Sequence, residues 1–455
     1  MKYSRTFMSF AVASALAAFA GGAQASGFAL IEQNASGLGN AFAGAAAAAD
    51  DASTIFFNPA GMTKLPGRQA VVAGHLIIPS SKFANTASTA AGGGFALGTN
   101  GGDAGDLAFV PNAYLSWQLS PQWFVGVGVN APFGLKTDYD AGWVGRFHAL
   151  KSEIKAINVN PSVAFKASDA FSFGFGLNWQ YVEAEITKAV NYTAVAFATA
   201  NPGLIAAVGA GNAGSNSIEA DDSAFGFNFG VMFNPAPNTN IGISYRSAMN
   251  LTLDGSASFA ARPAALTAAA LVIPALAAQI GDSPITANLK MPASWSLAVK
   301  HQINSKWDLL ADVTRTEWSS IPALVIVRNS GAVLENVPFN WKDTWRVGLG
   351  FNYRHNPDWI FRFGVARDQT PTSDAFRIPR LPDEDRTWLA FGGQYKVSKA
   401  GTLDFGYAHL FVKDPTLNLS GPPALSAQLV AGRGALVGAY DSQVNILSMQ
   451  YRHNF

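Results

Sequence analysis

The sequence predicts an all-β fold, a 14-stranded antiparallel transmembrane β-barrel plugged by an N-terminal hatch. Three observations predict it. The chain begins with a secretory signal, aromatic residues alternate with small or polar ones at a period of two, and the connections between these segments are alternately short and long. We predict a signal peptide over residues 1–25, a hatch over residues 26–68 and the barrel over residues 69–455.

The first 25 residues have the parts of a secretory signal peptide. Lys2 and Arg5 form a basic start, residues 8–20 are apolar, and Ala23-Gln24-Ala25 is an A-x-A cleavage signal. We therefore expect an exported protein whose mature chain begins at Ser26.

Composition excludes several classes of function. The formal net charge is only +1 and the chain has no cysteine, so it offers neither a basic field for nucleic acid nor thiolates for a metal site. The six histidines are scattered, and neither G-x-S-x-G nor H-E-x-x-H occurs. We predict no enzyme, no metal, no cofactor and no nucleic-acid partner.

The predicted strands are recognised by their alternation. Phe171, Phe173 and Phe175 are interleaved with Ser172 and Gly174, and residues 225–233, 345–354 and 447–455 repeat the pattern. Successive side chains of a strand point to opposite faces of a sheet. A soluble sandwich also alternates, but rows of aromatic side chains opposite glycine, asparagine and arginine fit a lipid-facing exterior and a polar lumen. Strands in lipid must close into a barrel.

Connection lengths support the same fold. Tight turns, such as residues 120–122 and 168–170, alternate with long connections over residues 80–107, 191–220, 256–285 and 413–440. This is the arrangement of bacterial outer-membrane barrels, with the short turns in the periplasm. The predicted strands begin near Gln69, Ala108, Trp123, Ile154, Phe171, Ser223, Thr239, Ala287, Lys306, Lys342, Trp359, Arg386, Thr402 and Asp441.

Residues 26–68 do not alternate and are rich in small residues. A barrel of this width is not filled by its own side chains, so we expect this segment to lie in the lumen as a hatch. Asn58-Pro59-Ala60 should break it before the first strand, because proline drives the preceding residue toward extended backbone. Charged residues at the alternate strand positions that face the lumen should form ion pairs that hold the hatch and line the wall. They are Arg246, Lys300, Arg346, Arg362, Arg452, Asp308, Asp312 and Asp404.

Motifs along the whole mature chain resemble one known family. They are S-G-F-A-L at residues 26–30, S-G-L-G-N-A-F-A-G at residues 36–44, A-D-D-A at residues 49–52, Asn58-Pro59-Ala60, Tyr245-Arg246-Ser247, Trp307 with Trp318, and residues 359–364 and 378–388. These motifs closely resemble the FadL/TodX family of outer-membrane transporters for long-chain fatty acids and other hydrophobic compounds. The resemblance implies passive uptake in the bacterial outer membrane, with capture by loops, a deeper hydrophobic pocket and exit sideways through the wall.

The lateral opening is predicted where the third strand is interrupted. Alternation over residues 123–129 ends at Asn130, and Pro132, Phe133 and Gly134 follow. Proline cannot donate to a β-ladder, and glycine favours a bulge. The residues alone leave open a strand end followed by an ordinary loop. The matching position in the family carries a kink, which favours an opening at these four residues.

Two long outer connections are unusually apolar, which is typical of a ligand-capture groove or of a cap over the barrel. The resemblance adds a deep pocket containing Phe28 and Lys188, with Lys188 facing a carboxylate. A second basic residue of the family's fatty-acid site has no match in residues 334–342. The predicted capture residues are Phe197, Leu204, Ile205, Leu266, Leu271, Ile273 and Leu276.

Two substrates therefore stay open, a long-chain fatty acid and a monoaromatic or other neutral hydrocarbon. From other classes, the hatch and the apolar loops argue against a general porin, and the scattered histidines argue against an outer-membrane hydrolase. We further expect a monomer that contacts outer-membrane lipid and lipopolysaccharide, and that engages the barrel assembly machinery through the C-terminal Phe455.

Overall fold

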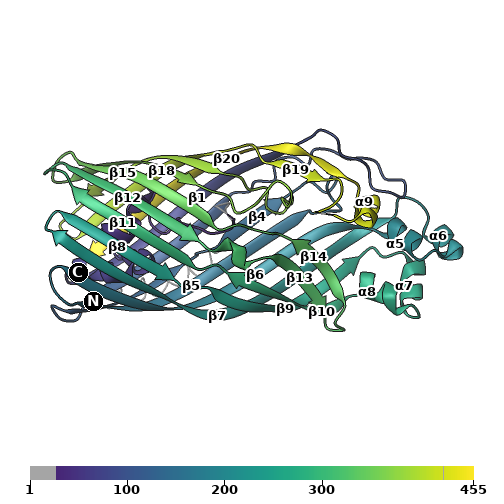
Figure 1. The fold of residues 1–455 in the computed structure, drawn as a ribbon, viewed down its shortest axis with the longest axis horizontal. Helices are drawn as coiled ribbons and strands as arrows, with labels where there is room; N and C mark the ends of the chain where they lie inside the picture. The colour runs from purple at the N-terminus through teal and green to yellow at the C-terminus, as the bar shows by residue number, and fades with distance from the viewer. Residues whose placement is uncertain (1–26, 424) are drawn as a thin grey trace, which may run out of the picture.

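The computed structural model describes residues 27–423 and 425–455, so the predicted signal peptide and Ser26 lie outside the described residues. The described chain is a closed antiparallel barrel (Figure 1). Strand β1 (Arg68–Asn85) pairs with β2 (Ala108–Gln118) on one side and with β20 (Leu436–Asn454) on the other. The sheet therefore has no free edge, as a bilayer requires.

The wall has 14 strand positions, several of which hold two consecutive strands. After β1 and β2 they are β3 with β4 (Trp123–Asn130, Gly134–Asp138), β5 (Lys151–Lys166), β6 (Phe171–Asn191), β7 (Ala213–Ala236), β8 with β9 (Thr239–Arg246, Met249–Ala260), β10 with β11 (Ser283–Met291, Ser294–Gln302), β12 with β13 (Trp307–Thr316, Ala323–Arg328), β14 with β15 (Val333–Pro338, Thr344–Arg354), β16 (Trp359–Asp368), β17 (Arg386–Lys396), β18 with β19 (Gly401–Val412, Thr416–Leu419) and β20.

The predicted alternation is confirmed residue by residue. Phe171, Phe173 and Phe175 are exposed on the outer face, whereas Ser172 and Asn178 of the same strand are buried in the lumen. Large apolar side chains are stable there only in contact with lipid. Six predicted strand starts coincide with the observed ones: Ala108, Trp123, Phe171, Thr239, Trp359 and Arg386.

The largest error concerns the hairpin of β6 and β7. Strand β7 begins at Ala213 rather than near Ser223, and its pairing with β6 continues to Asn191↔Ala213. The missed part reads A-G-S-N-S-I-E-A-D-D, in which small and polar residues occupy both faces. The outward-facing side chains of this part are small or polar and mostly exposed, whereas Asn216, Ile218 and Ala220 are buried on its inner face. It therefore lacks the outward aromatic residues by which the other strands were recognised. The predicted connection over residues 191–220 is correspondingly too long.

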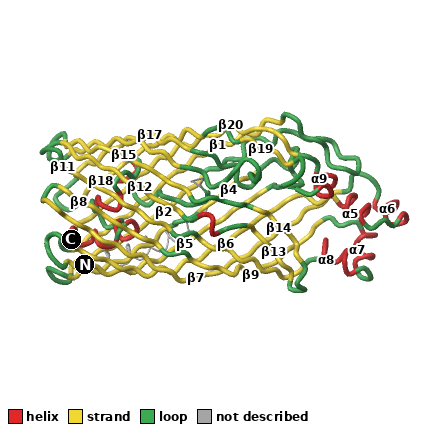
Figure 2. The backbone as a smooth tube through the Cα atoms, in the orientation of Figure 1, coloured by secondary structure: helices red, strands yellow, loops and turns green. Residues whose placement is uncertain are grey.

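Short helices and loops cover the barrel at the end opposite the C-terminus (Figures 1 and 2). Among the described residues, no helix is long and apolar enough to cross a membrane. We call this end the outer end, following the predicted orientation. Its helices are α5 (Tyr192–Ala198), α6 (Pro202–Val208), α7 (Ala264–Ala270), α8 (Pro274–Ile280) and α9 (Ala427–Arg433).

Residues 27–67, the N-terminal segment, lie inside the barrel against several strands. Wall glycines allow this close approach: a side chain at Gly174 would meet the backbone of Ala60, and one at Gly242 would meet that of Ala46. The inward-facing glycines of the alternating strands therefore make room for this segment. Its helices are α2 (Ala35–Leu38), α3 (Ala45–Ala48), α4 (Thr54–Phe57) and the 3-10 helix η1 (Pro59–Lys64).

Candidate functional site

Asn58 fastens the N-terminal segment to the wall. Its backbone is extended, with a φ of −162° before Pro59. Its side-chain oxygen accepts the backbone N–H of Ala60 at 3.1 Å, and its Nδ2 donates to the carbonyl oxygens of Ala46 at 2.7 Å and Val231 at 3.0 Å. The side chain thus links α3, η1 and strand β7.

Most of the charged lumen residues form ion pairs as predicted, but Arg246 and Arg452 instead donate to backbone carbonyl oxygens of the N-terminal segment. Arg362 lies 2.6 Å from the Asp404 carboxylate, and both side chains are almost fully buried. Lys300 pairs with Asp50 of the N-terminal segment. Arg246 donates to the carbonyl oxygen of Phe56 at 3.1 Å. Charged groups of the neighbouring strands β8 and β11 therefore hold the N-terminal segment to the wall.

The third strand is interrupted between Asn130 and Gly134. Strand β5 pairs with both halves, from Asn130↔Asn158 to Gly134↔Lys155. The ladder between β2 and β3 ends at Ala113↔Val129, before the interruption. Beyond that point, along residues 108–112, the described β2 pairs with β1 alone.

The N-terminal segment supplies the missing backbone partners at this interruption. Leu30 donates its N–H to the carbonyl oxygen of Pro132 at 2.8 Å, and Gly134 donates its N–H to the carbonyl oxygen of Phe28 at 2.9 Å. Ala29 and Phe133 form an antiparallel bridge between these two bonds. Residues 28–30 thus cover the interrupted strand from inside the barrel.

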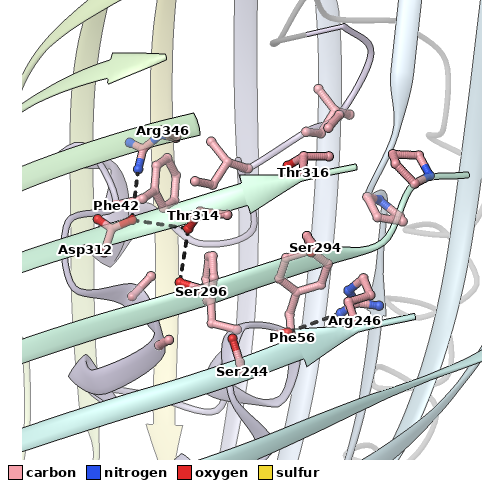
Figure 3. Close-up of a pocket in the computed structure, with 18 of the residues that line it drawn as sticks. Phe42, Phe56, Ser244, Arg246, Ser294, Ser296, Asp312, Thr314, Thr316 and Arg346 are labelled. Atoms are coloured by element: carbon pink, nitrogen blue, oxygen red, sulfur yellow. Dashed lines mark hydrogen bonds and ion pairs between the residues drawn. The ribbon is translucent and has the colours of Figure 1, made fainter. Parts of the chain in front are cut away.

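A cavity of about 160 Å³, the polar cavity, lies beside the interruption and is lined by Pro132 and Phe133. Figure 3 shows Phe42 and Phe56 of the N-terminal segment on one side of it. Hydroxyl groups and charges of strands β8, β11, β12 and β15 line the other side, among them Ser244, Ser294, Ser296, Thr314, Asp312 and Arg346.

A second cavity of about 100 Å³, the apolar cavity, lies between the polar cavity and the outer end. Its lining is almost entirely aliphatic and aromatic, and Ser152, Glu153, Glu335 and Arg380 are the polar exceptions. A site of this kind suits a ligand with a long apolar part and few polar atoms. Its apolar lining includes Phe28, Leu135, Ile186, Leu253, Leu289 and Trp341.

Phe28 separates these two cavities. The ring is 3% exposed and packs edge-on against Trp318 with ring centres 4.8 Å apart. The ring centre of Phe133 lies 5.7 Å away and that of Trp341 lies 5.9 Å away. Phe28 and Trp341 line the apolar cavity, whereas Phe133 and Trp318 line the polar one. This aromatic cluster is therefore the partition between the apolar cavity and the interrupted strand.

The cationic residues lie at the outer end of the apolar cavity. Lys188 forms an ion pair with Glu335, and the other oxygen of Glu335 lies 3.0 Å from Arg433 of α9. Arg380, from the connection between β16 and β17, lines the same cavity. Burial beside Arg433 lowers the pKa of Arg380 to about 10, although Glu335 opposes the shift, so the guanidinium stays charged at neutral pH.

This arrangement corrects part of the sequence prediction. Lys188 reaches the cavity only through Glu335, because it is not among the described residues that line the cavity. The region over residues 334–342 indeed supplies no cation, but Arg380 lines the apolar cavity, and Arg433, like Lys188, lies next to it through Glu335. Arg380 lies within the sequence motif at residues 378–388, so this motif could have indicated it as a site residue. No sequence motif indicated Arg433, because it lies in α9, within a connection of which only the length was predicted.

The predicted capture residues mostly form a packed cap. Leu266 and Leu276 are buried, and Leu204 is nearly so, in the same apolar cluster as the wall of the apolar cavity. Ile205 and Ile273 are half-buried against that cluster. Phe197 and Leu271 are exposed, by 55% and 85%. Only these two of the seven residues are largely exposed to a ligand arriving from solvent in the described conformation.

The chain matches the family model described as "Outer membrane protein transport protein (OMPP1/FadL/TodX)" over residues 16–455. The chain belongs to this family. As a FadL-family member it is an outer-membrane protein that transports hydrophobic compounds, and it is not an enzyme.

Relatives of this FadL-family chain support the assignment over nearly its whole length. It is 31% identical over 429 residues to a 47 kDa outer membrane protein of Pasteurella multocida, covering 93% of this chain and 95% of that protein. It is 27% identical over 431 residues to the long-chain fatty acid transport protein of Escherichia coli, covering 92% and 95%.

Solved structures agree with the fold. A FadL homologue of Pseudomonas aeruginosa superimposes with a TM-score of 0.85 at 27% identity, covering 94% of this chain and all of that one. The toluene transporter TodX of Pseudomonas putida superimposes with a TM-score of 0.67 at 18% identity, covering 95% and 100%. The second comparison bears on the fold alone.

Proposed function

We propose that this FadL-family chain takes up long-chain fatty acids passively across the outer membrane. The observation that carries the proposal is the apolar cavity with cations at one end. An acyl chain in such a cavity gains about 0.8 kcal/mol for each buried CH₂ group. Arg380, Arg433 and Lys188 at the outer end offer charge-assisted hydrogen bonds to a carboxylate, which are stronger than neutral ones.

In this proposal the ligand leaves through the wall rather than through the periplasmic end. Phe28 would move away from Trp318, and residues 28–30 would release Pro132 and Gly134. The route then leads between β2 and β4 into the bilayer, so that the acyl chain never crosses water. We propose that residues 27–67 act as the hatch that blocks the periplasmic end. Their burial, and the ion pair of Lys300 with Asp50, support this role.

One observation favours a second candidate, a neutral monoaromatic hydrocarbon. The apolar cavity is small, and Glu335 already neutralises part of the positive charge at its end. A single aromatic ring needs less room than an acyl chain and no cation.

Calorimetric binding to the purified, detergent-solubilised protein tests the proposal. We expect saturable binding of oleate, weakened several-fold by Lys188→Ala, and weak or absent binding of toluene. Lys290→Ala is the matched control, because Lys290 is exposed on β10 away from the cluster. Binding of toluene without oleate would move the assignment to hydrocarbon uptake and would remove Lys188 from the site.

We further propose that the chain is a monomer that contacts outer-membrane lipid and the barrel assembly machinery. The rows of exposed aromatic and aliphatic side chains would face outer-membrane lipid and lipopolysaccharide. Phe455 is 67% exposed at the C-terminus and would be available to the barrel assembly machinery. Closure of the wall by β1 and β20 of one chain fits a monomer.

A further inference from the structure

A third cavity, the outer cavity, lies next to the apolar one and has a volume of about 50 Å³. Leu425, Leu429 and Arg433 line it on the side of α9. The outer and apolar cavities share a boundary made of Glu335, Val337, Ile378 and Arg380. A ligand that passes from one to the other must therefore cross the Glu335 ion pairs.

Glu335 is a single carboxylate among three cations. Lys188 and Arg433 bind its two oxygens, and Arg380 is near enough to interact with it electrostatically. Arg380 donates its own hydrogen bonds to neutral groups: the carbonyl oxygens of Lys151, Thr187 and His148 at 3.1–3.2 Å, and the Ser152 hydroxyl at 2.9 Å.

The neighbouring acids are occupied elsewhere. Glu153 and Glu185 lie 2.9 and 2.6 Å from the Lys151 ammonium. The cluster of Lys188, Arg380 and Arg433 with Glu335 therefore has an excess of positive charge. Buried charge is costly unless it is paired, so this cluster favours an additional anion.

We propose that Glu335 is a resident carboxylate at the head-group position, and that a fatty-acid carboxylate binds by exchanging with it on Lys188 and Arg433. This inference rests on the proposed uptake of fatty acids. Exchange breaks the contact between β14, which carries Glu335, and α9, which carries Arg433. Arrival of the head group thereby opens the boundary between the outer and apolar cavities. A neutral ligand with the same tail has nothing to exchange and leaves Glu335 in place.

The test compares oleate with oleyl alcohol, which has the same tail and no charge, on the full mature chain in detergent. If Glu335 competes with the ligand, Glu335→Gln raises the affinity for oleate about tenfold, a change of about 1.4 kcal/mol. Its affinity for oleyl alcohol stays within about twofold, because competition acts only on the head group. Glu335→Asp keeps the competing charge and stays near the wild type for both ligands. Glu219→Gln removes a carboxylate from the exposed face of β7 and is the matched control.

Arg433→Gln keeps the inference testable if Glu335→Gln does not fold. It should weaken oleate about tenfold while leaving oleyl alcohol unchanged, because a charged partner is lost from the head group alone. A loss of oleate affinity in Glu335→Gln, or equal changes for the two ligands in either variant, overturns the exchange. If the wild type binds oleate and Glu335→Gln does not bind it more tightly, the exchange is rejected and the proposed function is kept. Absence of oleate binding in both the wild type and Glu335→Gln would reject the proposed function itself.

Discussion

The backbone N–H of Leu30 donates a hydrogen bond of 2.8 Å to the carbonyl oxygen of Pro132. Pro132 lies where β3 and β4 are interrupted and where β2 loses its partner on that side. From inside the barrel, the N-terminal segment thus supplies backbone partners to residues 132–134. A bond of this kind can be broken without unfolding the barrel, because β5 holds both halves of the interrupted strand.

Phe28→Ala should loosen this closure. Loss of a buried phenylalanine ring costs about 3 kcal/mol or more, and here the cost falls on the packing of residues 28–30 against Trp318 and Trp341. We expect faster hydrogen exchange of the Leu30 and Gly134 amides and faster uptake of fatty acid into cells. Phe225→Ala removes an exposed ring from β7 and is the control. Unchanged exchange in Phe28→Ala would contradict the role of Phe28 as partition.

Asp50→Asn should increase ion conductance through the barrel. The substitution removes the partner of Lys300 and leaves that ammonium largely buried beside the N-terminal segment. We expect little conductance from the wild type in planar bilayers and frequent openings from the variant, because the hatch is less firmly held. A general porin would instead conduct steadily in both proteins.

Asp404→Asn should destabilise the barrel by about 3–5 kcal/mol, because it leaves the buried Arg362 guanidinium without its charged partner. Urea unfolding of the detergent-solubilised protein measures the change. The double variant Arg362→Met with Asp404→Leu removes both charges, and it should recover much of the loss. A double variant that loses as much stability as Arg362→Met and Asp404→Leu lose separately, added together, would show that the pair is not coupled.

The outer connection that contains His148 should loosen as pH falls. His148 is buried, its Nε2 lies 3.0 Å from the carbonyl oxygen of Gly434, and burial with the nearby Arg433 lowers its pKa to about 3. Above pH 6.5, the usual pKa of histidine, the His148 ring is neutral both in the packed connection and when the connection has opened. Between pH 6.5 and 3, His148 binds a proton only when the connection has opened. The free energy that favours the packed connection therefore falls by up to about 1.4 kcal/mol per pH unit.

Hydrogen exchange of the Ala149 amide at pH 7 and pH 5, corrected for the intrinsic rate, measures this effect, because that amide is bonded to Gly145 within the connection. Protection should be lower at pH 5 in the wild type. His148→Gln cannot gain a proton, so its protection should be the same at both values. A pH dependence that persists in the variant would assign the effect to another group.

The amino-acid sequence by itself determined the strands, the tight turns and the face of each strand that meets lipid. These properties depend on neighbours within a few residues, and a period of two places Phe171 and Ser172 on opposite sides whatever the rest of the chain does. Family membership also followed from local motifs, such as Asn58-Pro59-Ala60. Local patterns failed where the outward face of a strand carries small or polar side chains in place of aromatic ones, as at the start of β7.

Tertiary structure alone decided the charge cluster and the closure of the interrupted strand. Lys188, Glu335, Arg380 and Arg433 come from four separate parts of the chain, and only closure of the barrel with its outer connections brings them to one cavity boundary. Sequence reasoning predicted Lys188 as a cation for a ligand, but could not predict its partner Glu335, which lies 147 residues away. Electrostatic interactions depend on distance in space, which spacing along the chain does not give.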